Sequence, residues 1–338
     1  MISSMKKKII NYLILVLAII LVLYFTLKDN FNDIIYELKT VNIGIYLVAV
    51  LIFFISLIFK SLSLCIFSNE YKKYSAFKTY NLTLISLFLN GITPFQTGGQ
   101  PFQIYLMKKD GFRISDATNA MISDCIVYQI ALILIGFISL IANLFLGYFS
   151  MDRYLSIFVI LGFILNVLVL VFLIVVTSAK KTGYKVVKKI INFLFNLKFM
   201  KRFENKKEDL IKSLEHFYFT GKKRKKSKNS IIFGIILNMI YLTLLYIVPI
   251  FIFESLKNVD ITFMQAFTAS SFVMILGNII PIPGATGGIE YSFMQFFGKF
   301  VKGALLSSGM LLWRFTTYLL GLIVGSVVLM FKKGEKKR

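Results

Sequence analysis

Residues 90–101 read NGITPFQTGGQP, and residues 278–290 read NIIPIPGATGGIE. Each stretch interrupts a longer apolar region, which covers 79–107 in the first case and 263–298 in the second. Both stretches contain an asparagine, then a proline, then Thr-Gly-Gly, and both end near an amide or an acid. Because proline and glycine interrupt helices, each apolar region is expected to form two helical arms joined at the quoted stretch.

The composition around these two breaks is that of a membrane protein. Hydrophobic residues make up 57% of the 338 positions and the mean hydropathy is +0.76, well above what a water-soluble domain of this size needs for its core. The apolar residues gather in runs of about 20, the length that crosses a bilayer core of about 30 Å. Clear runs of this kind lie at 9–27, 43–59, 117–147, 154–178, 230–253 and 304–331.

The placement of the net charge of +23 predicts an orientation. The charge lies in five segments: the N-terminus, 68–78, 108–116, 180–229 and the tail from Lys332. These segments share one side of the membrane if every clear run is a full span and both interrupted regions return to the side they entered. The positive-inside rule places that side in the cytoplasm. We therefore expect a single all-α polytopic membrane domain over 1–338, with about six full transmembrane helices, two re-entrant helical hairpins and cytoplasmic termini.

The expected spans and hairpins form an inverted repeat. The first unit is the span 43–59, a hairpin and the span 117–147, and the second is the span 230–253, a hairpin and the span 304–331. Each element is oriented opposite to its counterpart. Broken helices at matching positions of inverted repeats indicate the substrate site of a transporter. A kink that serves only helix packing would account for one such break more readily than for two matched breaks.

The two breaks offer backbone groups for ligand binding. Backbone that leaves helical geometry at membrane depth must be buried in protein or line a wet cavity, because lipid cannot satisfy its polar groups. The returning arms begin near Gly99 and Gly288, so their N–H groups and positive dipole ends are expected to face the middle of the protein. Such helix N-termini suit an anionic headgroup such as phosphate.

Ionisable side chains in the apolar runs are further candidates. Arg314 lies about ten residues into the last run, roughly 15 Å deep, where a cation needs a partner or water. Asp124 is expected to be its counter-charge, in a structural ion pair or in a substrate site. Glu290 opens a returning arm, where the helix dipole favours an acid. Lys60, close to the end of its run, is expected to snorkel to the membrane surface.

The segment 180–229 is predicted to be a basic amphipathic segment on the cytoplasmic side. Apolar clusters alternate there with lysines, as in helices that lie on an anionic inner leaflet. The basic cluster 222–226 lacks an accompanying aromatic RNA-binding motif, so a nucleic-acid partner is not expected. The sole histidine, His216, lies in this basic segment, where we expect it to be a solvated polar residue. Cys65 and Cys125 lack the spacing of a metal-binding pair. We predict no catalytic residue, no metal site and no cofactor.

At these residues the chain resembles the membrane portion of the lysylphosphatidylglycerol synthase/flippase family. The resemblance spans nearly the whole chain and rests on the sequence elements Thr93-Pro94, Gly98-Gly99-Gln100-Pro101, Gly111, Asp124, Pro283-Gly284-x-x-Gly287-x-x-Glu290 and Arg314. Many relatives carry Gly-Glu where this chain has Gly99-Gln100. The resemblance implies a bacterial cell-membrane protein that makes or moves aminoacylated phosphatidylglycerol, which protects bacteria from cationic antimicrobial peptides.

The resemblance leaves two functions open. The first is a flippase for an anionic or aminoacylated phospholipid such as lysylphosphatidylglycerol, and the second is a phosphatidylglycerol lysyltransferase, or its membrane subunit, that uses lysyl-tRNA. The chain ends seven residues after Phe331, so we expect no cytosolic aminoacyltransferase domain in it and favour the flippase. A scaffold that organises envelope enzymes is a third alternative. Membrane phospholipids are the expected partners, and a homo-oligomer or a separate cytosolic synthase stays open.

The breaks, the charges and the resemblance together define a predicted substrate site. Its residues are Asn90, Thr93, Pro94, Gly98, Gly99, Gln100, Asp124, Asn278, Pro283, Gly284, Gly287, Glu290 and Arg314. Further amides near the first hairpin, Gln96, Gln103 and Gln129, are expected to bind the ligand or to satisfy unwound backbone.

Overall fold

The computed structural model describes residues 31–149, 153–178 and 227–334, except 258, 260 and 279, together with scattered positions between 183 and 215. Within these residues the chain forms helices and turns and no strand, which confirms the predicted all-α class. The predicted span 9–27 and most of the basic segment 180–229 lie outside the described residues.

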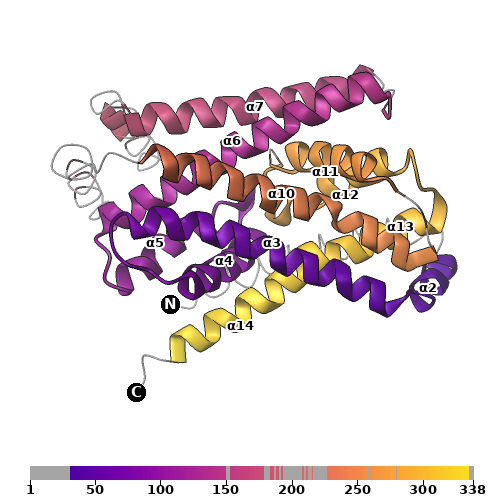
Figure 1. Ribbon diagram of the computed structural model, residues 1–338, viewed down its shortest axis with the longest axis horizontal. Helices are drawn as coiled ribbons and strands as arrows, with labels where there is room; N and C mark the ends of the chain where they lie inside the picture. Colours follow the sequence, from indigo (N-terminus) through magenta and orange to yellow (C-terminus); the bar gives the residue numbers. More distant parts are fainter. Residues whose placement is uncertain are drawn as a thin grey trace.

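Figure 1 shows the described helices. In chain order the elements are α2 (Phe31–Lys39), α3 (Ile43–Asn69), α4 (Ala76–Gly91), η1 (Pro94–Gln96), α5 (Gly99–Lys109), α6 (Ile114–Leu146), α7 (Arg153–Ser178), α10 (Lys228–Lys257), α11 (Phe263–Gly277), η4 (Pro283–Ala285), α12 (Gly288–Phe297), α13 (Gly303–Arg314), the π-helical turn η5 (Phe315–Leu319) and α14 (Leu320–Gly334).

Five helical segments of the described chain are long and apolar enough to cross a membrane. They are Ile43–Asn69, Ile114–Leu146, Leu155–Thr177, Lys228–Leu256 and Gly303–Lys332. These segments coincide with five of the predicted spans. Large apolar side chains are exposed along α3, α6, α7 and α10, as expected of faces that meet lipid rather than water.

Helix α3 extends well beyond the apolar run that predicts it. The run ends at residue 59, whereas the helix continues to Asn69. Small polar side chains of this extension are buried against other helices, among them Ser61, Ser63 and Ser68. Hydropathy alone therefore places the end of this helix too early, and Lys60 lies inside the helix rather than at its end.

Each interrupted apolar region is a pair of helices joined by a short 3₁₀ turn. Helices α4 and α5 flank η1, helices α11 and α12 flank η4, and the two arms of each pair pack together. Both turns begin with proline and contain residues in the left-handed region: φ is 53° at Phe95 and 63° at Gly284. The breaks are thus located where the sequence predicts them.

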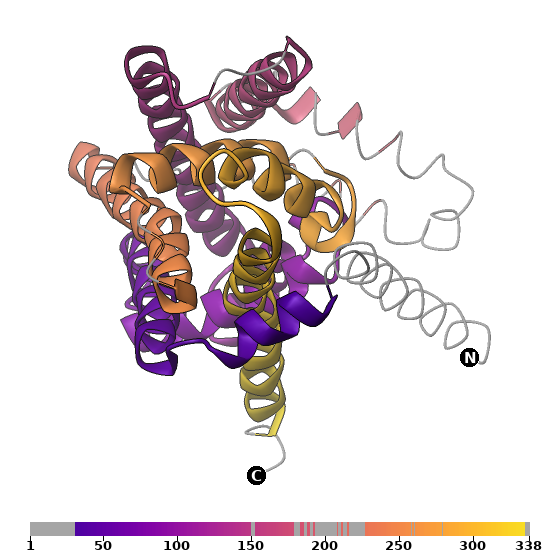
Figure 2. The ribbon, with the colours of Figure 1, turned by 90° about the vertical axis from the view of Figure 1, so that its right-hand side faces the viewer.

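The two turns contact each other. Turn η1 contacts η4, α14 packs along α4, and α10 packs along α3. Figure 1 shows α14 crossing obliquely beneath the long helices, and Figure 2 shows α7 at the periphery. Residues from both halves of the sequence therefore surround one central region.

An aromatic cluster fixes the second pair of arms against the following helix. The ring of Phe293 on α12 stacks on Phe297 at 4.3 Å and on Trp313 of α13 at 4.8 Å between centroids. Offset aromatic packing of this kind is directional as well as apolar. Because Trp313 precedes Arg314, this stack also sets the position at which Arg314 enters the bundle.

Candidate functional site

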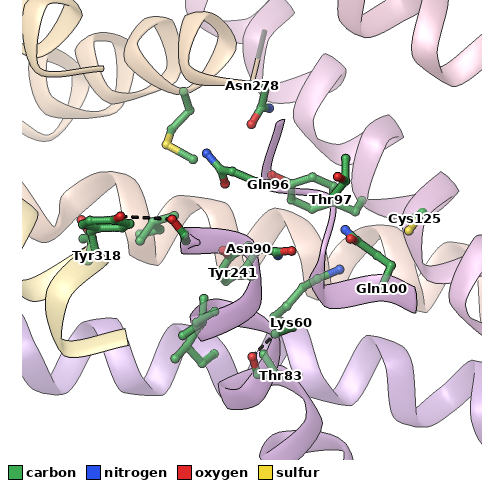
Figure 3. A pocket seen from close by; sticks show the side chains of 18 of the residues that line it. Lys60, Thr83, Asn90, Gln96, Thr97, Gln100, Cys125, Tyr241, Asn278 and Tyr318 are labelled. Carbon is green, nitrogen blue, oxygen red and sulfur yellow. Dashed lines mark hydrogen bonds between the residues drawn. The ribbon is translucent and has the colours of Figure 1, made fainter. Parts of the chain in front are cut away.

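A cavity of about 520 Å³ lies between the two breaks (Figure 3). Its walls come from α3, α4, α5, α6, α7, α10, α11, α12, α13 and η5 and from both 3₁₀ turns. The lining combines aliphatic and aromatic side chains with amides, hydroxyls and two cations, Lys60 and Arg314. Asp124 is the one carboxylate that lines it among the residues that the structure describes. The cavity is thus mainly apolar, with a limited set of polar and charged groups in its walls.

The structure divides the predicted site residues into two groups. Those that line the cavity are Asn90, Gln100, Asp124, Asn278, Gly284 and Arg314. Those outside the lining, in the turns or at the starts of the returning helices, are Thr93, Pro94, Gly98, Gly99, Pro283, Gly287 and Glu290. The additional amides Gln96, Gln103 and Gln129 also line the cavity.

The first break is tied together by side chains of its own descending arm. The Gly99 N–H donates to Asn90 Oδ1 at 2.7 Å, and the Gly98 N–H donates to Thr93 Oγ1 at 2.9 Å. A Cβ at Gly99 would lie 2.6 Å from Asn90 Oδ1, so this approach requires glycine. Asn90 therefore supports the start of α5 as well as facing the cavity.

The second break is held by an ion pair. Arg314 Nε lies 2.7 Å from Glu290 Oε1, and Arg314 Nη2 donates to the Gly284 carbonyl oxygen at 3.1 Å. Glu290 Oε2 accepts the N–H of Gly287 at 2.6 Å. The partner of Arg314 is therefore Glu290, and the predicted pairing with Asp124 is wrong. Glu290 starts a helix that packs on the Arg314 helix, which sequence separation alone does not reveal.

The backbone donors of the returning arms are only partly open to a ligand. The N–H groups of Gly98, Gly99 and Gly287 each donate to a side-chain oxygen of the protein. For these three groups the prediction of free donors is wrong. Gly99 is buried, Gly98 is half-buried and Gly287 is exposed, yet in this conformation a neighbouring side chain binds the N–H group of each.

Tyr318 connects the two breaks. Its hydroxyl donates to the Gly91 carbonyl oxygen of the first break at 3.1 Å (Figure 3). The Arg314 guanidinium lies over its ring at 4.3 Å, and a Cβ at Gly284 would come within 2.5 Å of that ring. Tyr318 lies in the π-helical turn, and such turns occur frequently at functional sites. One side chain thus contacts the first turn, the second turn and the cavity arginine.

Lys60 is the partner of Asp124. Lys60 Nζ lies 2.7 Å from Asp124 Oδ2 and also donates to Asn238 Oδ1 at 3.1 Å. The side chain of Asp124 is 5% exposed and that of Lys60 is 22% exposed, toward the cavity. The predicted snorkelling of Lys60 is wrong, because α3 continues beyond it and keeps it inside the bundle.

Sequence reasoning also missed Ser63, Asn238, Tyr241 and Tyr318. Lys60 and Ser63 are three residues apart and share a helix face, a signal that is visible once the helix is extended to Asn69. Asn238 is a polar residue in the middle of an apolar run, which by itself marks a buried partner. In the described part of the chain, no group of three or more His, Cys, Asp or Glu side chains is placed to hold a metal ion.

Comparison with known proteins assigns the family. The family model described as the lysylphosphatidylglycerol synthase TM region matches residues 10–325. The chain belongs to this family. It is also similar to a UPF0104 membrane protein of Archaeoglobus fulgidus, with 22% identity over 259 residues that cover 75% of each chain. The matched span, together with the apolar helices, makes this chain a multi-pass membrane protein and confirms the resemblance identified from its motifs.

Proposed function

We propose that this chain is a lipid flippase or transporter that moves an anionic or aminoacylated phospholipid, such as lysylphosphatidylglycerol, across the bacterial cell membrane. The observation that carries the proposal is the single cavity lined by both breaks, with Lys60 and Arg314 in its walls. Such movement would change envelope charge and so resistance to cationic peptides. The predicted orientation, with both termini in the cytoplasm, belongs to the same proposal.

The charges of the cavity suit a headgroup that carries both a phosphate and an amino group. Lys60 and Arg314 are each neutralised by one carboxylate, Asp124 and Glu290. Paired charges reduce the cost of holding ions away from bulk water. A phosphodiester can take over one cation, while the amino group of an aminoacylated lipid can bind the carboxylate that this cation leaves.

The dimensions of the cavity favour a headgroup over a whole lipid. About 520 Å³ is in the range of pockets that hold small molecules, and two long acyl chains would exceed it. The acyl chains would then stay among the exposed apolar faces of the outer helices. The headgroup crosses through the protein while the chains follow through the bilayer.

For the cavity to open to one side of the membrane and then to the other, the two breaks must separate. In the described conformation η1 contacts η4, and Tyr318 is bonded to Gly91. In inverted-repeat transporters, one unit moves against the other around a fixed site. Loss of the Tyr318 bond, with rearrangement of the two turns, would be the first step of that exchange here.

The experiment is a flipping assay with purified full-length protein in liposomes. Fluorescent phosphatidylglycerol and its lysyl form are compared for the wild type, for Arg314→Ala and for Lys332→Ala, whose lysine lies outside the cavity lining. We expect the wild type and Lys332→Ala to move lipid and Arg314→Ala to lose this movement. Absence of movement by a well-folded wild type would overturn the proposal, and movement by Arg314→Ala would overturn the site.

A further inference from the structure

Lys60, Asp124, Ser63 and Asn238 form a closed ring of polar contacts. Lys60 Nζ bonds Asp124 Oδ2 and Asn238 Oδ1, the Ser63 hydroxyl donates to Asp124 Oδ1 at 2.5 Å, and Asn238 Nδ2 donates to Ser63 Oγ at 2.8 Å. The members come from three helices, α3, α6 and α10. We call these four residues the Lys60 ring.

The Lys60 ring is buried except on the side of the cavity. Ser63 and Asn238 are fully buried, and Asp124 is nearly so. Lys60 and Asp124 line the cavity, and Figure 3 shows the Lys60 side chain extending into it. A ligand in the cavity can therefore reach the ammonium of Lys60, while the remaining members hold the other end of the ion pair in place.

We propose that the Lys60 ring couples the binding of a phosphate anion to the uptake of one proton by Asp124. This step rests on the proposed function, since it takes as the anion the phosphate of a lipid without an amino group, such as phosphatidylglycerol. The phosphate takes over the Lys60 ammonium, and the Lys60–Asp124 ion pair breaks. A buried carboxylate that has lost its cation favours the protonated form, so Asp124 takes a proton from the bulk solution by way of the cavity. The bound anion and the added proton cancel, and the net charge of the site does not change.

The Ser63 hydroxyl gives the added proton a partner. A hydroxyl is one donor and has two acceptor lone pairs, and Ser63 Oγ already accepts from Asn238. Its second lone pair can accept a hydrogen bond from a protonated Asp124. The surroundings of Glu290 differ, because Glu290 is bonded by the Arg314 guanidinium and by the Gly287 N–H, both of which are donors without lone pairs. The geometry therefore assigns the proton to Asp124 and not to Glu290.

The other titratable groups around Asp124 are not suited to take this proton. Cys125 and Tyr128 on α6 and Tyr241 on α10 line the same cavity and are neutral in their ordinary protonated state. Helix α5 presents the uncharged Gln100 and Gln103. Lys60 on α3 is the cation of the first ion pair of the site, and Arg314 with Glu290 forms the second.

The proposal is tested by counting protons during ligand binding. Full-length protein in detergent and weak buffer near pH 7 is titrated with dihexanoyl-phosphatidylglycerol or with dimethyl phosphate, a phosphodiester that does not itself exchange protons at this pH. Binding is followed by calorimetry and proton uptake by a pH indicator dye. We expect about one proton taken up per ligand bound by the wild type. Uptake with the short-chain lipid alone identifies a lipid headgroup, and uptake with dimethyl phosphate as well identifies the phosphodiester itself as sufficient.

Two variants separate the coupling from the binding. Asp124→Asn keeps a hydrogen-bonding group of similar size but cannot gain a proton, so we expect it to bind with uptake close to zero. Asp110→Asn alters a carboxylate outside the cavity and should keep the wild-type uptake. Should Asp124→Asn fail to fold, Glu290→Gln serves instead and is expected to retain proton uptake with whatever ligand it binds.

Each contrary result has a distinct meaning. Binding by the wild type without proton uptake, uptake retained in Asp124→Asn, or no binding of either probe overturns the coupling. Liposomes in which no lipid moves, combined with normal proton uptake in detergent, overturn the transport function and support the coupling. Lipid movement without proton uptake on binding supports the function and overturns the coupling.

Discussion

The guanidinium of Arg314 bonds Glu290 through Nε at 2.7 Å and the carbonyl of Gly284 through Nη2 at 3.1 Å. A single side chain thus joins the second turn to the first residues of the helix that follows it. Both partners of the ion pair are largely buried, with 11% and 9% of their side chains exposed. Arg314 therefore shapes the second break as well as lining the cavity.

Replacing one partner of this ion pair should destabilise the protein more than replacing both partners. Arg314→Met leaves a buried carboxylate with one backbone donor, and we expect a loss of about 3–5 kcal/mol in the free energy of unfolding. Arg314→Met/Glu290→Met should be less destabilised than Arg314→Met alone, because no uncompensated charge remains. The free energy of unfolding is measured in detergent for each variant, with Lys332→Met as the matched control. A loss in the double variant equal to the sum of the losses in Arg314→Met and Glu290→Met would contradict this prediction.

Lys60 should contribute directly to anion affinity. A hydrogen bond to a charged group contributes about 1.5–3 kcal/mol, so Lys60→Gln should weaken binding of dihexanoyl-phosphatidylglycerol about 10- to 150-fold. Lys72→Gln is the matched control, since Lys72 bonds the Asp110 carbonyl outside the cavity. Calorimetric titration of both variants measures the difference. Equal affinities for the two variants would place the anion elsewhere.

Gly284 is required both for its backbone conformation and for its contact with Tyr318. Gly284 and Gly303 have nearly the same φ, 63° and 64°, but a Cβ at Gly303 meets nothing within 4 Å. Gly303→Ala should therefore destabilise the protein only through the left-handed conformation of residue 303, by roughly 1–2 kcal/mol. Gly284→Ala adds a clash with the Tyr318 ring, and we expect about 1–3 kcal/mol more. Thermal unfolding of the two variants tests the difference, and equal costs would show that the ring moves aside freely.

Tyr74 gives the protein a pH-dependent contact at one end of the bundle. It lies in the turn between α3 and α4, outside the membrane-spanning segments, and its hydroxyl donates to Asp110 Oδ2 at 2.5 Å. Burial, and then the bond to the Asp110 carboxylate, raise the pKa of Tyr74 above its ordinary value of 10.0. The unfolded chain therefore loses this proton at a lower pH than the folded protein.

The sign of the effect follows from this pKa shift. The stability that Tyr74 adds is fully present below pH 10 and falls as the pH rises above it, by up to about 1.4 kcal/mol per pH unit. Tyr74→Phe should thus be less stable than the wild type at pH 8, and the difference should shrink between pH 10 and 11. Melting curves at both ends of this interval measure it. A difference that grows with pH would contradict the raised pKa.

The sequence predicts the position of the breaks better than it predicts the contacts. Proline and glycine at Pro94 and Gly284 act on the local backbone, so their effect is visible in the sequence itself. The pairing of Arg314 depends on how α12 packs on α13, which the Phe293 and Trp313 stack determines. Hydropathy cannot register that packing, and it selects Asp124 only because this residue also lies within an apolar run.

Lys60 illustrates the same limit. An apolar run ends at the first charge, whereas a helix ends where its backbone loses partners. Helix α3 continues through the buried residues Ser61 and Ser63, so Lys60 lies in the middle of the helix. There it pairs with a carboxylate and does not extend to the membrane surface. The predicted first span and the amphipathic character of 180–229 stay predictions, since the described residues do not include them in full.

The Lys60 ring also has a consequence for the order in which the protein is made. Its members are separated by 64 residues between Lys60 and Asp124 and by 178 residues between Lys60 and Asn238. During synthesis, α3 and α6 enter the bilayer well before α10 leaves the ribosome. The charged pair must therefore hold together at first without its amide partner, and Asn238 completes it only when the second half of the chain inserts. The two hydrogen bonds of Asn238, with Lys60 and with Ser63, thus form only once both halves of the chain are in place.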